Sequence, residues 1–161
     1  MTPWLRGVLL LLAMCVAAPQ ARATEPSPVL GRWSVDVSRL PMPPEARPKR
    51  VTFAFDAVEA DKWRIRVEIV QADGSERIST ATVALDGSTS AIAGDTLEAD
   101  AIAARLPQPG VLVLALGKAR VPASTRVYAV SADGRHLVET ATHFGADGKA
   151  VMRMFQLDRA H

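Results

Sequence analysis

The sequence predicts an all-β protein, an antiparallel meander that closes into a barrel or folds as a sandwich, with little helix. Apolar and polar residues alternate with a period of two in one short segment after another, which is typical of strands with one buried face. The segments follow one another at intervals of about 10 to 14 residues, and Gly- or Pro-bearing turns separate them. Four Asp-Gly pairs mark such turns, because glycine tolerates the positive φ that tight hairpins require.

The first half of the chain contains four expected strands. Trp33, Val35 and Val37 alternate with polar residues and indicate the first strand. Four prolines in the loop at 40–48 argue against a helix or a central strand there. The other expected strands of this half are 50–57, 62–71 and 76–85, with Asp-Gly turns after the second and third of these.

The second half contains five more expected strands. The segment Pro107-Gln108-Pro109-Gly110 predicts a turn, and Asp133-Gly134 and Asp147-Gly148 predict two hairpins. The alanines within 97–105 also suit a helix, so that segment has two interpretations. The strands expected here are 96–106, 111–118, 125–130, 135–144 and 150–158.

The N-terminus indicates export. Arg6 precedes an apolar run at 7–18 that is too short to span a bilayer, and small residues surround a cleavage point after Ala23. Residues 1–23 are therefore interpreted as a signal peptide, which places the protein in the periplasm or outside the cell. Cys15 raises the alternative of a lipoprotein, but Met14 stands where a lipobox has a small residue. A lipid anchor is the disfavoured alternative.

Removal of the signal peptide leaves a single expected domain. Residues 24–29, with Pro26 and Pro28, are expected to form a flexible lead-in, and 30–161 the barrel domain. The domain has no cysteine, so disulfides and a cysteine nucleophile are excluded. It keeps 17 of the 19 basic residues against 17 acidic ones, and this balance does not support nucleic-acid binding. No transmembrane span is expected in the mature chain.

The start of the first strand, Gly31-Arg32-Trp33-Ser34-Val35-Asp36, resembles exported bacterial lipocalin-like β-barrel proteins. Pro43-Pro44, the succession of Asp-Gly hairpins and the terminal Leu157-Asp158-Arg159 fit the same pattern. The resemblance implies an up-and-down barrel of about 8–10 strands whose cavity holds a small apolar ligand. It brings no catalytic residue.

The resemblance also implies structural roles at one end of the barrel. Gly31 and Trp33 open the first strand, and Trp33 is expected to plug the closed end. A basic residue from the last strand, Arg153 or Arg159, would then pack against the indole ring in a cation–π contact.

Inward-facing apolar side chains are the expected cavity wall. Glu139 and His143, four residues apart, share one face of a strand, where they would fix the polar end of a ligand if that face is the inner one. The opposite register puts Val138 and Phe144 inside and leaves the pair in solvent. The apolar wall residues expected are Phe53, Phe55, Trp63, Ile65, Val67, Leu112 and Leu114.

Motifs for catalysis, metal binding or phosphate binding do not occur in the sequence. The three histidines lack metal-ligand spacing, no Gly-x-Ser-x-Gly elbow is present, and no Gly-rich loop joins a strand to a helix. No metal, cofactor or catalytic residue is therefore expected. The sequence favours non-covalent binding of a small hydrophobic or amphipathic ligand. The alternative is a filled barrel that acts as a structural or interaction module with another cell-envelope protein.

Overall fold

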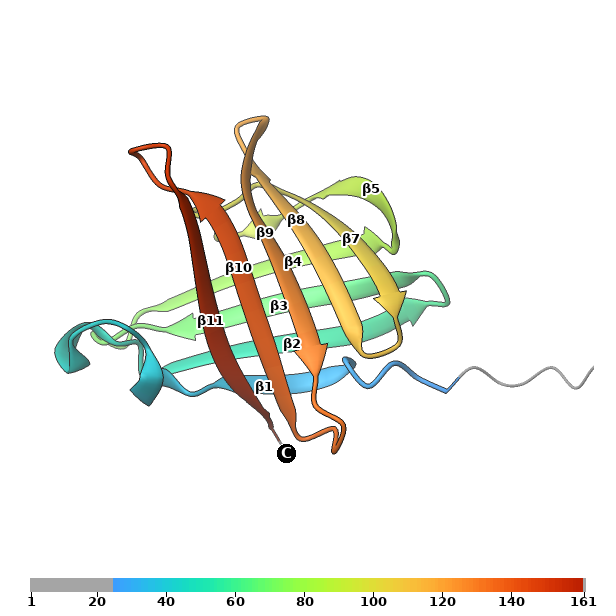
Figure 1. The fold of residues 1–161 in the computed structure, drawn as a ribbon, viewed down its shortest axis with the longest axis horizontal. Coiled ribbons are helices and arrows are strands. Elements are labelled where there is room, and N and C mark those ends of the chain that lie inside the picture. Colours follow the sequence, from blue (N-terminus) through green and yellow to red (C-terminus); the bar gives the residue numbers. More distant parts are fainter. Residues whose placement is uncertain (1–24, 161) are drawn as a thin grey trace, which may run out of the picture.

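A computed structural model describes residues 25–160 and confirms the all-β barrel. One antiparallel sheet of 11 strands contains nearly all of the regular structure (Figure 1). Residues 1–23, the expected signal peptide, lie outside the described residues. The strands are β1 Gly31–Val35, β2 Arg50–Glu59, β3 Lys62–Val70, β4 Glu76–Ala84, β5 Asp86–Ala91, β6 Ala93–Gly94, β7 Ala101–Gln108, β8 Val111–Lys118, β9 Val121–Val130, β10 His136–Phe144 and β11 Ala150–Arg159.

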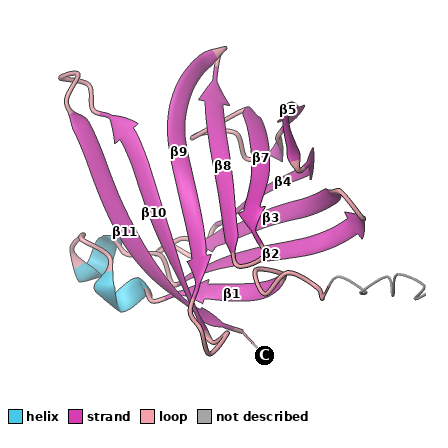
Figure 2. Ribbon diagram, turned by 45° about the vertical axis from the view of Figure 1, so that its right-hand side comes forward, coloured by secondary structure: helices cyan, strands magenta, loops and turns pink. Residues whose placement is uncertain are grey.

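The sheet order is β5-β7-β8-β9-β10-β11-β1-β2-β3-β4-β6, so neighbours along the chain are mostly neighbours in the sheet. The last strand pairs with the first through Trp33↔Arg159 and Val35↔Leu157. Contacts of β4 with β5 and β7 bring the two ends of the sheet together and nearly close the barrel. Strands β1–β4 run steeply across β7–β11, and the core lies between these two layers (Figures 1 and 2).

Local turn chemistry explains the hairpins. At Asp73, Asp133 and Asp147, the carboxylate accepts a hydrogen bond from the backbone N–H two residues later, at 2.8, 3.0 and 3.1 Å. The glycine after each aspartate has a positive φ, between 70° and 90°. These aspartates hold the backbone in the turn, and glycine supplies the conformation that the turn needs.

The segment at 95–108 shows where the sequence was ambiguous. No helix forms there, since residues 101–108 are strand β7, and the strand expected at 96–106 begins five residues later. Two short strands, β5 and β6, raise the total above the expected 8–10. Helical structure among residues 25–160 is limited to two 3₁₀ turns, Val37–Arg39 and Pro44–Ala46. The second lies in the proline-rich loop. No helix in the described part of the chain is long and apolar enough to cross a membrane.

One end of the barrel is closed by a packed core. Trp33, Phe55, Leu137 and Leu157 are fully buried there, and residues from several strands join them in one cluster. Val29 is also fully buried, and its carbonyl accepts a hydrogen bond from the Trp33 indole N–H at 2.8 Å. Residues 24–29 were expected to form a flexible lead-in. This expectation does not hold for the last of these residues, which pack against the barrel.

Candidate functional site

The pairing of β10 decides which of its faces points into the barrel. Leu137, Glu139 and Ala141 are buried, whereas Phe144 is 76% exposed. Of the two registers left open by the sequence, the structure has the one that turns Glu139 and His143 inward. Glu139 lies directly opposite Tyr128 of β9 and Phe155 of β11, which places a carboxylate in the middle of the barrel wall.

A cavity of about 430 Å³ occupies the end of the barrel away from the Trp33 core. We call it the open-end cavity. Its volume falls within the range of about 300–1,000 Å³ that is common for small-molecule sites. A smaller void of about 90 Å³, lined by Ile65, Leu114 and Tyr128 among others, shares Phe53, Val67 and Arg126 with it.

The open-end cavity has two chemically different walls. Strands β1–β3 supply an apolar wall of Val35, Val51, Phe53, Val67 and Ile69. Strands β9–β11 supply nearly all of its charged and polar side chains, because alternate residues of these strands face inward. The β9–β11 wall consists of Ala123, Ser124, Arg126, Glu139, Ala141, His143, Arg153 and Phe155.

Arg126 is the centre of the charged cluster on the second wall. Its Nη2 lies 2.6 Å from Glu98 Oε2, and its Nη1 lies 3.3 Å from Glu139 Oε1. The Glu139 side chain is only 3% exposed, whereas Glu98 lies at the solvent side with 64% exposed. The guanidinium therefore connects a buried carboxylate to one at the rim of the cavity.

Burial sets the direction of the pKa shift for the two acidic groups of this cluster, Glu139 and Tyr128. It raises the pKa of Glu139 above its ordinary value, while the positive charge of Arg126 and a hydrogen bond from Tyr128 act in the opposite direction. Burial also raises the pKa of Tyr128 well above its ordinary value, so the phenol stays neutral. For Arg126, burial lowers the pKa but the surrounding acidic groups outweigh it, and the arginine stays charged. Its Nε is buried and has no hydrogen-bond partner among the described residues.

Arg153 lies in the same wall and in the same row as Arg126. Ala141 is opposite Arg126 on one side and opposite Arg153 on the other, so the three form one row across β9, β10 and β11. His143 lies in the next row, opposite Val151. Two guanidinium-bearing residues thus flank a side chain that is only a methyl group.

The structure divides the expected wall residues into two groups. Phe53, Ile65, Val67, Leu114, Glu139 and His143 line the open-end cavity or the smaller void. Phe55, Trp63 and Leu112 line neither space and are buried in the core cluster. The inward-facing residues of a strand therefore include core positions as well as positions that line a cavity.

Of the residues expected to have structural roles, Arg159 and Gly31 lie beside Trp33, whereas Arg153 does not. Arg159 covers the Trp33 ring at 4.1 Å, so it rather than Arg153 supplies the cation–π contact. Its side chain also donates hydrogen bonds to the carbonyls of Pro28, Leu30 and Gly134. Gly31 has a φ of +114°, and a Cβ there would lie 2.9 Å from Arg159 Nη1. This glycine leaves room for the arginine.

The sequence analysis missed Arg126, Tyr128 and Glu98. Arg126, Tyr128 and Val130 alternate along an expected strand, which was a signal that an arginine shares a face with apolar neighbours. Glu98 falls within the strand expected at 96–106, whereas the structure places it before β7, so the expected strand did not indicate its position. Within residues 25–160, no three His, Cys, Asp or Glu side chains are placed to hold a metal ion.

Comparison of the chain with protein-family models and with curated proteins found no significant match.

Proposed function

We propose that this protein is exported by the signal peptide at 1–23 and binds a small hydrophobic or amphipathic molecule, without covalent chemistry, in the open-end cavity. The observation that carries the proposal is the division of that cavity into an apolar wall on β1–β3 and a charged wall on β9–β11. Such a site combines apolar surface for affinity with a few polar groups for orientation.

The apolar wall supplies the driving force. Ligand surface that leaves water for Val35, Phe53, Val67 and Ile69 contributes about 25 cal/mol per Å². The charged wall sets how the ligand lies, because a polar group left unpaired in the cavity would cost about 1–3 kcal/mol. Binding should therefore need both walls.

Filling the cavity tests the proposal directly. Ala141 is buried on the charged wall, and Ala141→Leu would place three more carbon atoms in the cavity. We expect the wild type to bind the neutral dye N-phenyl-1-naphthylamine saturably, with enhanced fluorescence, and Ala141→Leu to weaken this binding at least about tenfold. Ala129→Leu is the matched control, since Ala129 is exposed on the neighbouring strand β9.

One result of the dye titration would contradict the proposal. Equal binding by Ala141→Leu and the wild type would place the dye elsewhere and overturn the cavity as the site. Circular dichroism and thermal melting of each variant show whether a loss of binding reflects a loss of fold.

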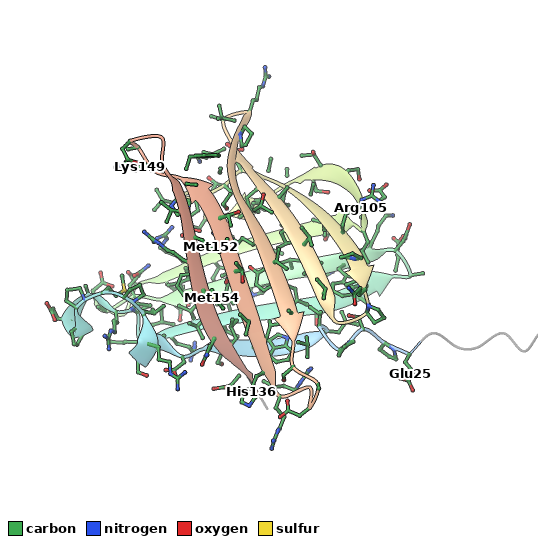
Figure 3. All side chains as sticks on the ribbon, viewed as in Figure 1. Glu25, Arg105, His136, Lys149, Met152 and Met154 are labelled. Atoms are coloured by element: carbon green, nitrogen blue, oxygen red, sulfur yellow. The ribbon has the colours of Figure 1, made fainter. Side chains whose placement is uncertain are left out.

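The alternative is a structural or interaction module that meets a cell-envelope protein through its outer face. Met152 and Met154 favour it, since both are 68% exposed on β11, the strand on which Figure 3 labels them. Their opposite neighbours Thr142 and Thr140 also face outward. Absence of saturable dye binding by the folded wild type would favour this alternative over ligand binding.

A further inference from the structure

Arg153 differs from the other charged residues around the cavity in its partners. Arg77 of the smaller void pairs with Asp95 at 2.5 Å, and Arg126 pairs with Glu98 and Glu139. Arg153 lines the open-end cavity but makes no ion pair or side-chain hydrogen bond with any residue from 25 to 160. It is a solvent-exposed cation at the wall of a ligand-sized cavity, without a counter-charge from the described residues.

The surroundings of Arg153 leave space for an anion. Ala141 is its opposite neighbour on β10, and this residue projects only a methyl group between Arg153 and Arg126. Strands in a sheet lie about 4.8 Å apart, so the two arginine backbones are separated by roughly 10 Å across this row. Long arginine side chains from both sides can reach a group placed over Ala141.

The other titratable groups nearby do not supply the missing negative charge. On β10, Glu139 is turned to Arg126, and His143 is the only other titratable residue on the inward face of that strand. On β11, the inward residues next to Arg153 are Val151 and Phe155, which are apolar. From the linker before β7, Glu98 already contacts Arg126 at 2.6 Å.

We propose that the ligand is an amphipathic monoanion whose carboxylate lies over Ala141 and pairs with Arg153, while its apolar part lies on the β1–β3 wall. This inference rests on the proposed function and specifies its ligand class. A planar guanidinium binds a carboxylate through two parallel hydrogen bonds, which suits this position better than a neutral or cationic head group. Arg126, held by its two acidic partners, adds positive potential from the opposite side of the row.

Three ligands with the same chain and different head groups test the proposal. Isothermal titration at pH 7 would compare decanoate, 1-decanol and decylammonium, each below its aggregation concentration. We expect decanoate to bind about tenfold more tightly than 1-decanol, the effect of one charge-assisted hydrogen bond in a partly hydrated site. Decylammonium should bind more weakly than 1-decanol, because its charge repels Arg153.

Substitution of Arg153 assigns the effect to this residue. Arg153→Met should weaken decanoate binding about tenfold and leave 1-decanol binding within about twofold. Arg153→Lys should bind decanoate more tightly than Arg153→Met but less tightly than the wild type. Lysine keeps the positive charge but cannot donate the two parallel hydrogen bonds of a guanidinium. Arg64→Met is the matched control, since Arg64 is exposed on the outer face of β3, and it should change neither ligand.

The outcomes separate the two proposals. If 1-decanol binds and decanoate binds no more tightly, the acidic ligand class is wrong and the cavity remains a binding site. If decanoate binds more tightly but Arg153→Met affects neither ligand, the pairing with Arg153 is wrong. If decylammonium binds most tightly, the sign of the charge is wrong. If none of the three ligands binds the folded wild type saturably but the dye does, only the ligand class is overturned; if the dye also fails to bind, the proposed function is overturned as well.

Discussion

Two arginines on the same face of β11 show how the two ends of this barrel differ. Arg159, at the closed end, stacks on Trp33 and donates hydrogen bonds to three backbone carbonyls. Arg153, six residues earlier and also inward, lines the open-end cavity and makes no such contacts with the described residues. The same residue type is part of the packing at one end and faces an open site at the other.

The apolar residues follow the same division. At the closed end, Trp33, Phe55 and Leu157 are fully buried against one another and against Val29. At the open end, Val35, Val51 and Val67 are only half-buried and face the cavity. Stability should therefore depend mainly on the closed end, and ligand binding on the open end, because packed side chains stabilise more than those that border a void.

The largest expected effect is at the centre of the closed end. Trp33→Ala should lower the free energy of unfolding by about 3–5 kcal/mol, because it empties a fully buried site and removes the ring under Arg159. Val67→Ala, at the open end, should cost about 1 kcal/mol, since its side chain is only half-buried. Urea denaturation monitored by circular dichroism measures both. Equal losses would contradict the division into two ends.

The charged cluster between the two ends gives the next effect. Arg126→Met leaves the Glu139 carboxylate buried without its cation and should cost about 3 kcal/mol at neutral pH. The double variant Arg126→Met with Glu139→Leu should regain most of that stability, because the uncompensated charge is gone. Urea denaturation measures the free energy of unfolding of both variants. A double variant no more stable than the single one would show that Arg126 stabilises through packing and not through this pair.

The two arginines of β11 provide a matched pair of substitutions. Arg159→Met should lower the free energy of unfolding by about 2 kcal/mol, through loss of the cation–π contact and of hydrogen bonds from a charged donor. Arg153→Met should change it by less than about 0.5 kcal/mol, as is usual for a residue without such contacts. Thermal and urea unfolding of both variants test this. A reversed order would contradict the roles assigned to the two residues.

The smallest effect is a pH dependence from Glu139. Burial raises the pKa of this carboxyl above its ordinary value of 4.5, so the folded protein binds the proton more tightly than the unfolded chain does. Between pH 4.5 and the raised pKa, the folded state carries more protons, and the stability contributed by Glu139 decreases as pH rises. Above the raised pKa this contribution no longer changes.

Glu139→Gln isolates that contribution. Other titrating groups are common to both proteins, and the lost ion pair changes mainly the overall level. The unfolding free energy of the wild type minus that of the variant should therefore fall as pH rises from 4.5 and then level off. Urea denaturation at a series of pH values measures the difference. A difference that rises with pH would show a lowered pKa and contradict the effect of burial.

Local patterns explain what could be predicted from the sequence. The Asp-Gly hairpins at Asp73, Asp133 and Asp147 depend on residues within the turn, so they could be located without knowledge of the fold. The resemblance to lipocalin-like barrels implied that Arg153 or Arg159 of the last strand packs on Trp33, and the structure assigns this contact to Arg159. Alternation likewise showed which residues share a face of each strand.

The sequence could not show at which level along the barrel axis an inward-facing residue lies. Phe53 and Phe55 share a face of β2 and look equivalent in the sequence. Both belong to the core cluster, yet only Phe53 also lines the cavity. The difference depends on how β2 pairs with β1 and β3, which is a long-range property. The inward direction of Glu139 has the same origin, because a shift of one residue would turn it to solvent.

The most direct test of the open-end cavity as a binding site is a titration of ¹⁵N-labelled protein with decanoate, followed by backbone amide chemical shifts. Saturable shifts should concentrate at the open end, around Val67, Ala141 and Arg153, with little change at Trp33 and Leu137. Shifts centred on the outer face at Met152 and Met154, or the absence of saturable shifts in the folded protein, would contradict it.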